Sequence, residues 1–168
     1  MTSDMGQVAV ETANVTLRPV EPADEPFLLE LYAATRADEV ALVPWSEAQK
    51  KSFIEQQFKA QQEHYKKNYP DASHDVIICD QRNVGRIYVA RLPAAIRIVD
   101  ITIAAAERNR GIGTGLIKGL IREAENSSRP LTIYVETFNP SVQLFQRLGF
   151  LPGEEQGMHV LMKWSGAA

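Results

Sequence analysis

The sequence predicts an α/β fold in which a mixed, mostly antiparallel sheet carries helices on both faces. Three β-branched runs follow one another with only short turns between them, which predicts neighbouring antiparallel strands. Helical periodicities stand on both sides of these runs, and a further strand follows the second helical region. Strands clustered between helices are typical of a single sheet covered on its two sides.

The N-terminal part is expected to contain a tail, a strand and a helix. Residues 1–13 show little periodicity, so we expect a flexible tail there and a single domain over residues 14–168. A short strand is predicted from Val15 to Val20. Proline lacks only a donor that the first helical turn leaves unpaired, so the next residues predict a helix start: Pro22, Asp24 and Pro26. The apolar residues of this helix are Phe27, Leu28, Leu31 and Tyr32.

A capping box predicts the start of a second, longer helix. In Ser46–Gln49 the serine hydroxyl and the glutamine amide can each satisfy a backbone N–H of the other residue. Ile54, Phe58 and Tyr65 then recur at near-helical spacing until Pro70. These features indicate a long amphipathic helix.

The central part is predicted as a meander followed by a crossover. The strands are expected at Val76–Cys79, Val84–Ala90 and Ile96–Ile103. A helical stripe follows, formed by Leu116, Ile117, Leu120 and Ile121, and Leu131–Val135 predicts the next strand. A strand, a helix and a strand of this length pair in parallel, so the strands on either side of the crossover helix are expected to be parallel.

The C-terminal part is predicted as one short helix and one strand. Asn139-Pro140 starts the helix and Gly149 ends it. Met158–Trp164 supplies the last strand, which can stay within a monomer or join the sheet of a second subunit in a homodimer. The predicted order of elements is β-α-α-β-β-β-α-β-α-β.

Composition and charge argue against several classes of function. The 168 residues contain 18 Lys and Arg against 21 Asp and Glu, for a net charge of −3, and no basic block that suits nucleic acid. No apolar stretch approaches the roughly 18 residues that span a bilayer, and the first residues lack the order of a signal peptide. We therefore expect a cytoplasmic protein without a nucleic-acid or membrane partner.

The residue types that usually hold metals or act as nucleophiles are sparse. The single cysteine, Cys79, lies in a strand-like run, where a free thiol behaves as a small buried hydrophobe. His64, His74 and His159 have no ligand-like spacing, so no metal is expected. The sequence also has no Gly-x-Ser-x-Gly nucleophile elbow.

A glycine turn before the crossover helix is the strongest functional signal. Gly111, Gly113 and Gly115 stand where the helix is expected to begin, around Ile112. Glycines there let backbone N–H groups approach an anion, and the helix N-terminus adds partial positive charge. Arg108 and Arg110 can add cations. The alternative is a glycine-rich turn that only lets the helix pack closely.

Two other phosphate loops fit this turn less well. A Walker A loop requires Gly-Lys-Ser/Thr, and no lysine occupies the required place. A Rossmann fingerprint requires a third glycine at the position of Leu116, and it should leave the strand directly, whereas residues 104–110 intervene here. Glu136 after the next strand imitates the acidic residue that binds a ribose, so a nucleotide-dependent oxidoreductase stays an alternative.

The motif Arg108-x-x-Gly111-x-Gly113 resembles the Arg/Gln-x-x-Gly-x-Gly/Ala signature of the GNAT acetyltransferase family. Ile101–Ile103 stands where that family has its strand before the loop, and residues 139–150 are similar to its Asn, short helix and Gly-Phe ending. The resemblance covers roughly residues 96–164, and the order of elements fits from Asn14 onward. It implies that the two strands around the glycine turn are parallel and splayed.

The resemblance implies an N-acetyltransferase that moves an acetyl group from acetyl-CoA to a primary amine, by direct attack in a ternary complex. The amine belongs to a small molecule or a peptide. The cofactor-binding residues implied are Ile101, Ile103, Arg108, Asn109, Arg110, Gly111, Ile112, Gly113, Thr114, Asn139 and Phe145. Asn139 matches a family residue that touches the pantetheine arm or an ordered water, and it can also cap the short helix.

Two carboxylates are candidates for the general base. Asp100 lies on the strand before the glycine loop and Glu136 ends the next strand, so both can approach the cleft where these strands diverge. The alternatives are that Asp100 pairs with Arg97 or Arg86 across the sheet and that Glu136 is only solvated. With Asn139, these carboxylates make up the predicted catalytic set.

One position departs from the family pattern. Many members carry a tyrosine four residues before the Gly of Gly-Phe, as general acid to the leaving thiolate, and Phe145 stands there. Tyr134 or Tyr88 can substitute for it from a neighbouring strand or can simply pack. The alternative function is therefore a weakly active or non-catalytic acyl-CoA-binding module.

The acceptor side is implied by the family's first two helices and their connection. This part of the chain points to Tyr32, Arg36 and Trp45 as substrate residues. Arg36 can hold a carboxylate of the acceptor or can be an exposed helix charge.

Overall fold

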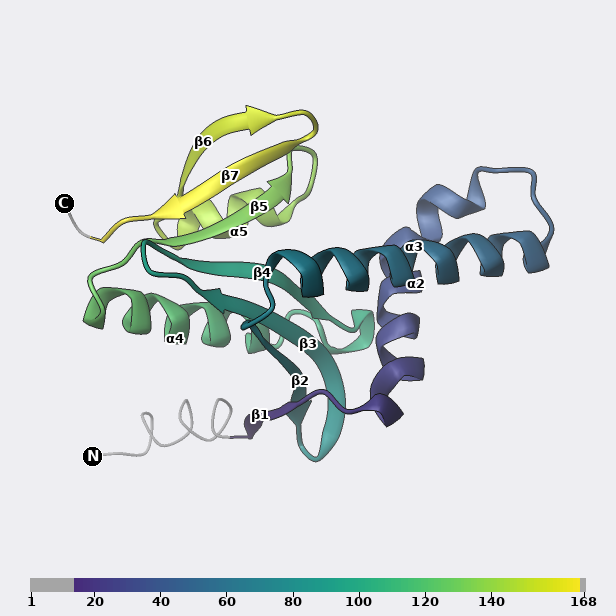
Figure 1. Cartoon of the computed structure of the whole chain (residues 1–168), viewed down its shortest axis with the longest axis horizontal. Coiled ribbons are helices and arrows are strands. Elements are labelled where there is room, and N and C mark those ends of the chain that lie inside the picture. The colour runs from purple at the N-terminus through teal and green to yellow at the C-terminus, as the bar shows by residue number, and fades with distance from the viewer. Residues whose placement is uncertain (1–13, 167–168) are drawn as a thin grey trace.

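The computed structural model describes residues 14–166 of the chain, so the tail expected at residues 1–13 lies outside the described residues. The described part contains one seven-stranded sheet in the order β1-β2-β3-β4-β5-β7-β6 (Figure 1). The strands are β1 (Val15–Pro19), β2 (Ser73–Cys79), β3 (Arg82–Arg91), β4 (Ile96–Ile103), β5 (Leu131–Glu136), β6 (Leu151–Gln156) and β7 (His159–Trp164). The α-helices are α2 (Glu25–Ala41), α3 (Glu47–Asn68), α4 (Ile112–Asn126) and α5 (Ser141–Arg147), with short 3-10 helices η1 (Pro22–Asp24) and η2 (Ala105–Glu107).

The mixed, mostly antiparallel sheet predicted from the sequence is confirmed. The strands β1 to β4 pair as an antiparallel meander, and β5, β7 and β6 pair antiparallel to one another. Only β4 and β5, which flank the crossover helix α4, are parallel. No helix of the described residues is long and apolar enough to span a bilayer.

The helix boundaries follow the local sequence signals closely. At α3 the Ser46 Oγ accepts from the Gln49 backbone N–H at 3.2 Å, and Gln49 Oε1 accepts from the Ser46 N–H at 2.9 Å, so the predicted capping box is present. The helix α4 begins at Ile112, where the glycine turn predicted a start. These positions were predictable because capping depends on residues only three apart.

The prediction of one strand after the short helix was wrong, because the structure has two. The missed strand β6 is an edge strand, and all six of its residues are exposed. Its sequence, with Pro152, Gly153 and two glutamates, shows no apolar alternation. Prolines and charges are common on edge strands because they discourage pairing with other chains.

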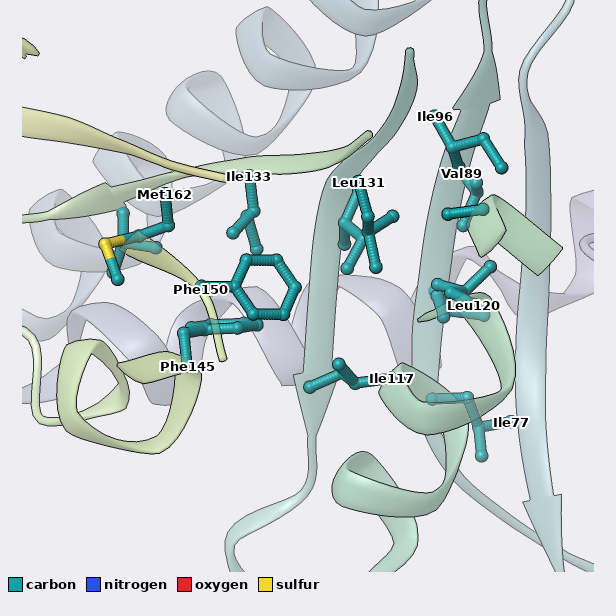
Figure 2. Close-up of a cluster of buried hydrophobic side chains, with 14 of the residues drawn as sticks. Ile77, Val89, Ile96, Ile117, Leu120, Leu131, Ile133, Phe145, Phe150 and Met162 are labelled. Carbon is teal, nitrogen blue, oxygen red and sulfur yellow. The ribbon is translucent and has the colours of Figure 1, made fainter. Parts of the chain in front are cut away.

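The sheet separates two hydrophobic clusters. The larger one joins α4 and α5 to the sheet and contains Ile117, Leu120, Phe145, Phe150 and Met162 among its buried residues (Figure 2). The smaller one lies between α2 and α3 and contains Leu28, Leu31, Tyr32, Ile54 and Phe58. Helices therefore cover both faces of the sheet, as predicted.

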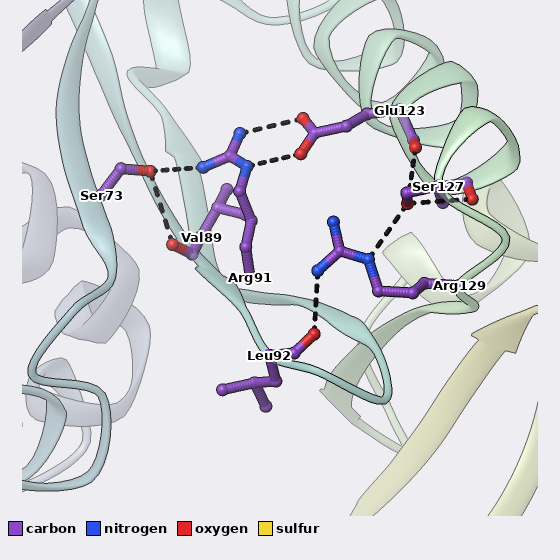
Figure 3. Close-up of polar contacts among 8 residues, drawn as sticks. Ser73, Val89, Arg91, Leu92, Glu123, Ser127 and Arg129 are labelled. Carbon is purple, nitrogen blue, oxygen red and sulfur yellow. Dashed lines mark hydrogen bonds and ion pairs between the residues drawn. The ribbon is translucent and has the colours of Figure 1, made fainter.

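Hydrogen bonds at the end of β3 join α4 to the sheet. Arg91 donates to both carboxylate oxygens of Glu123 on α4, at 2.6 and 3.0 Å, and to the Ser73 hydroxyl of β2 at 3.0 Å (Figure 3). Arg129, after the end of α4, donates to the Leu92 carbonyl oxygen at 2.9 Å. Because these contacts join α4 to β2 and β3 at its C-terminal end, they help to fix the helix whose N-terminus carries the glycine turn.

Candidate functional site

The strands β4 and β5 diverge after a short pairing. Their parallel register extends only from Ile96–Leu131 to Ile98–Ile133, although β4 continues to Ile103 and β5 to Glu136. The sheet visibly divides between these two strands in Figure 1. A cavity of about 510 Å³ lies at the diverging ends and extends to α2 and α3.

The cavity brings together ten of the residues that the sequence singled out. They are Tyr32, Arg36, Asp100, Ile101, Ile103, Arg108, Gly113, Glu136, Asn139 and Phe145. Six other candidates are not among its lining residues: Trp45, Asn109, Arg110, Gly111, Ile112 and Thr114. The cavity is therefore the candidate site, with the glycine turn at one end and α2 and α3 at the other.

The glycine turn leaves backbone donors unpaired at the start of α4. Gly111 caps the helix with a left-handed φ of 79°, which glycine adopts without strain. The Gly115 N–H is the first to bond back, to the Gly111 carbonyl at 2.9 Å, so the N–H groups of Ile112, Gly113 and Thr114 have no acceptor within the helix. Such a helix start suits an anion.

The two arginines beside this turn lie apart. Arg108 lines the cavity and donates through Nε to the Ile103 carbonyl at 3.1 Å. Arg110 instead donates to Glu107 at 2.6 Å and to Asp80 at 3.2 Å, and it lines a different cavity of about 460 Å³ on the β1–β3 side of α4. Of these two arginines, Arg108 is therefore the one available to a ligand in the candidate site.

The two candidate carboxylates differ in their surroundings. Asp100 Oδ2 accepts a hydrogen bond from Nε of the buried Arg86 at 2.7 Å and forms an ion pair with its Nη2 at 2.7 Å, and the Thr102 hydroxyl also lies 3.3 Å from the carboxylate. Glu136 is exposed at the cavity, and its side chain makes no hydrogen bond within the part of the chain that the structure describes. It pairs in register with His159 of β7, which also lines the cavity.

The α5 end of the cavity combines a capping asparagine with a packed ring. Asn139 Oδ1 accepts from the Ser141 backbone N–H at 2.8 Å, so this side chain supports the start of α5. Phe145 is 2% exposed, and its ring lies 5.1 Å from that of Phe150. Of the two tyrosines considered as its substitutes, Tyr134 lines the cavity, whereas Tyr88 does not and stacks on His74.

The α2 and α3 end of the cavity joins two predicted substrate residues to residues that were not predicted to belong to the site. Arg36 Nε donates to the Tyr32 hydroxyl at 3.3 Å, and Arg36 Nη1 donates to Glu39 at 3.1 Å. Gln61, Tyr65 and Arg86 join them in the lining. Gln61 and Tyr65 lie four residues apart on α3, a spacing that puts them on one face, but nothing local shows that this face meets β3.

Burial changes the pKa of a tyrosine at the α2 and α3 end of the cavity. Desolvation, with the nearby Asp100 carboxylate, raises the pKa of Tyr65 well above its ordinary value, so the phenol stays protonated and can donate.

Trp45 packs edge-on against Phe53, with ring centroids 5.2 Å apart, outside the cavity. In the described residues no group of three or more His, Cys, Asp or Glu side chains is placed to hold a metal ion.

Comparisons with known proteins agree with this geometry. The model of the acetyltransferase (GNAT) family matches residues 32–150. No curated protein matches the sequence. A PaiA N-acetyltransferase from Thermoplasma acidophilum, solved with coenzyme A, superposes with a TM-score of 0.65 at 15% identity, over 90% of this chain and 98% of that one.

Two further solved structures show the same fold. A GNAT acetyltransferase from Elizabethkingia anophelis with acetyl-CoA bound has a TM-score of 0.54 and 18% identity, over 90% of this chain and 98% of that one. An acetyltransferase from Thermus thermophilus has a TM-score of 0.63 and 17% identity, over 91% and 96% of the two chains.

Proposed function

Because the chain belongs to the GNAT acetyltransferase family, we propose that it transfers an acetyl group from acetyl-CoA to a primary amine by direct attack in a ternary complex. The observation that carries this proposal is the cavity between the diverging ends of β4 and β5, which joins the glycine turn to α2 and α3. One cavity can therefore hold the reacting ends of both substrates next to each other.

The glycine turn suits the pyrophosphate of acetyl-CoA. The N–H groups of residues 112–114 lack helical acceptors, and Arg108 lies on the same cavity wall. A Cβ added at Gly113 would meet only the Ile103 side chain, at 3.9 Å, so there is open space at the turn. Ile101, Ile103, Asn139 and Phe145 would flank the pantetheine arm. When bound, acetyl-CoA supplies an activated acetyl group as its thioester.

We assign the general base to Glu136 rather than Asp100. Arg86 and Thr102 already engage the Asp100 carboxylate, whereas the Glu136 carboxylate has no hydrogen-bond partner among the described residues and is free to accept a proton. Glu136 takes a proton from the substrate ammonium, directly or through a water. The amine nitrogen then bonds to the thioester carbonyl carbon, the nitrogen loses a second proton to water, the carbon–sulfur bond breaks, and the thiolate leaves.

Phe145 supplies no proton to that thiolate. Its ring is part of the core beside Phe150. Tyr134 of β5, which is 37% exposed and lines the same cavity, is the available substitute. General acids contribute about 10²-fold to 10⁴-fold to a rate, so the absence of a tyrosine at position 145 should slow turnover. It should not abolish turnover, because coenzyme A thiolate is a tolerable leaving group.

Titration with acetyl-CoA tests the cofactor site. Gly113→Leu puts a side chain into the space at the turn and should weaken binding at least about tenfold. Gly119→Leu is the matched control on α4, because a Cβ there meets only the mobile end of Arg122, at 3.7 Å. No binding of acetyl-CoA by the unmodified protein would reject the proposed function.

Release of free thiol from acetyl-CoA in the presence of a panel of amines tests the chemistry. Glu136→Gln should lower kcat by about 10²-fold and leave acetyl-CoA binding unchanged. Asp100→Asn should reduce kcat less. Tight binding of acetyl-CoA without turnover for any amine would favour the acyl-CoA-binding module instead.

A further inference from the structure

The α2 and α3 end of the cavity is built around one polar cluster. Arg86 of β3 is 3% exposed and donates to Asp100, and its Nη2 also donates to Gln61 Oε1 of α3 at 2.7 Å. The Arg86 guanidinium carbon lies 5.8 Å from the centre of the Tyr65 ring. Arg36 approaches from α2. All these side chains line the same cavity.

This cluster holds more hydrogen-bond donors than the protein uses. Within residues 14–166, three groups donate no hydrogen bond: the Gln61 amide nitrogen, the Tyr65 hydroxyl and Arg36 Nη2. Arg86 Nη1 is fully buried and also lacks a partner. A buried guanidinium nitrogen without an acceptor leaves the charge of Arg86 only partly compensated, which favours an anion near this side chain.

The charges at this end also favour an anion. Two arginines face one carboxylate, Asp100, so the cluster has an excess of positive charge. Glu39 offsets Arg36 only from a position that is 65% exposed and outside the cavity lining, where an ion pair is weak. Because burial keeps Tyr65 protonated, the phenol adds a donor and no negative charge.

We infer that the acceptor amine also carries a carboxylate, as an amino acid does, and that this carboxylate binds to Arg36, Gln61 and Tyr65, beside the charge of Arg86. The inference rests on the proposed function, and it assigns the class of acceptor. A carboxylate offers two oxygens in the planar arrangement that matches guanidinium and amide donors. The amine of such a molecule must lie in the same cavity, within reach of the thioester carbon and of Glu136. A polyamine would place positive charge against arginines and leave the donors unpaired.

Matched substrate pairs test the inference in the thiol-release assay. Leucine, phenylalanine and 4-aminobutyrate are compared with 3-methylbutylamine, phenethylamine and propylamine, which differ from them only by loss of the carboxylate. Spermidine is included as a polyamine. At least one carboxylate-bearing amine should exceed its partner in kcat/KM by about tenfold or more. Equal or higher rates for the amines without a carboxylate would overturn the inference and leave the proposed function intact.

Tyr65→Phe tests whether the preference for a carboxylate arises at this cluster, because the substitution removes only the hydroxyl. It should lower kcat/KM about fivefold for the carboxylate-bearing amine, chiefly through KM, and leave the rate of its partner amine unchanged. Tyr69→Phe is the control, since the Tyr69 hydroxyl contacts Arg97 outside the cavity. An equal loss for both substrates would contradict the assignment.

A binding measurement separates the two proposals if no amine is acetylated. Calorimetry of the protein saturated with coenzyme A should still show binding of the same amino acids, weakened by Tyr65→Phe. In that case the proposed catalysis fails and the carboxylate site stands. Binding of the amines without a carboxylate at equal strength, or no binding of any amino acid, would reject the carboxylate site.

Discussion

Replacement of Gly85 by alanine should strain the sheet beside the candidate site. Gly85 of β3 pairs with Ile103 of β4, and a Cβ at this position would lie 2.3 Å from the Thr102 carbonyl oxygen and 3.1 Å from the Ile103 Cα. A carbon–oxygen contact normally requires about 3.3 Å, so the two strands would have to separate locally by about 1 Å. Both atoms belong to the backbone, so no change of rotamer can relieve the overlap.

The cost should lie near the upper end of the usual range for overpacking, about 3 kcal/mol. In a domain of this size that corresponds to a fall in Tm of about 6–12 °C. Thermal unfolding followed by circular dichroism measures it. Because Ile101 and Ile103 line the cavity, acetyl-CoA binding should weaken as well.

Gly113→Ala provides the matched control for this substitution. A Cβ at Gly113 meets only the Ile103 side chain, at 3.9 Å, and alanine is the better helix former, so we expect a gain of about 0.5–1 kcal/mol. A Tm of Gly85→Ala within about 2 °C of the unmodified protein, on the order of 0.5 kcal/mol, would refute the close approach of β3 to β4.

Three further predictions concern stability. The hydrogen bonds from Arg18 hold the pKa of Asp24 at about 2, below its ordinary 3.8, so this carboxylate stabilises the fold above pH 3.8 and its contribution is lost as the pH falls toward 2. Asp24→Asn should therefore cost about 1.5–3 kcal/mol in urea unfolding at pH 7, and this difference should shrink in acid. Burial, with the Arg86 charge, lowers the pKa of His74 from 6.5 to about 4, so its protonation favours the unfolded chain and stability should fall between pH 6.5 and 4. Melting curves of His74→Gln over that range should lack this decrease, and an unchanged slope would contradict the assignment. Asn139→Ala should cost about 1 kcal/mol by removing the acceptor of the Ser141 N–H, seen as a lower Tm, and no loss would mean that this cap is dispensable.

The elements that the sequence predicted well depend on neighbouring residues. The capping box at Ser46, the start of α4 at Ile112 and the parallel crossover to Leu131 follow from spacings of a few residues or from the length of one connection. The edge strand β6 was not predicted, because its pairing with β7, rather than its own residue pattern, makes it a strand.

The candidate site was likewise predictable from the sequence only in part. The glycine turn, Asp100, Glu136 and Asn139 could be proposed from motif and position, and the structure brings the three side chains and Gly113 to one cavity. The choice between Asp100 and Glu136 as the general base could not be made from the sequence, because it depends on the partners of each carboxylate. The sequence left Arg97 and Arg86 as possible partners of Asp100, and the register of β3 and β4 puts Arg86 beside it.

By itself the sequence determined the family and the order of most elements, and it led to the proposal of a pyrophosphate site at the glycine turn, because each of these depends on residues close together in the chain. Only the tertiary structure decided which polar groups meet at the α2 and α3 end of the cavity. Gln61 and Tyr65 reach Arg86 from 25 and 21 positions away, once α3 packs across the sheet. Contacts of that kind depend on strand register and on the placement of a helix over a sheet, which no local pattern of residues specifies.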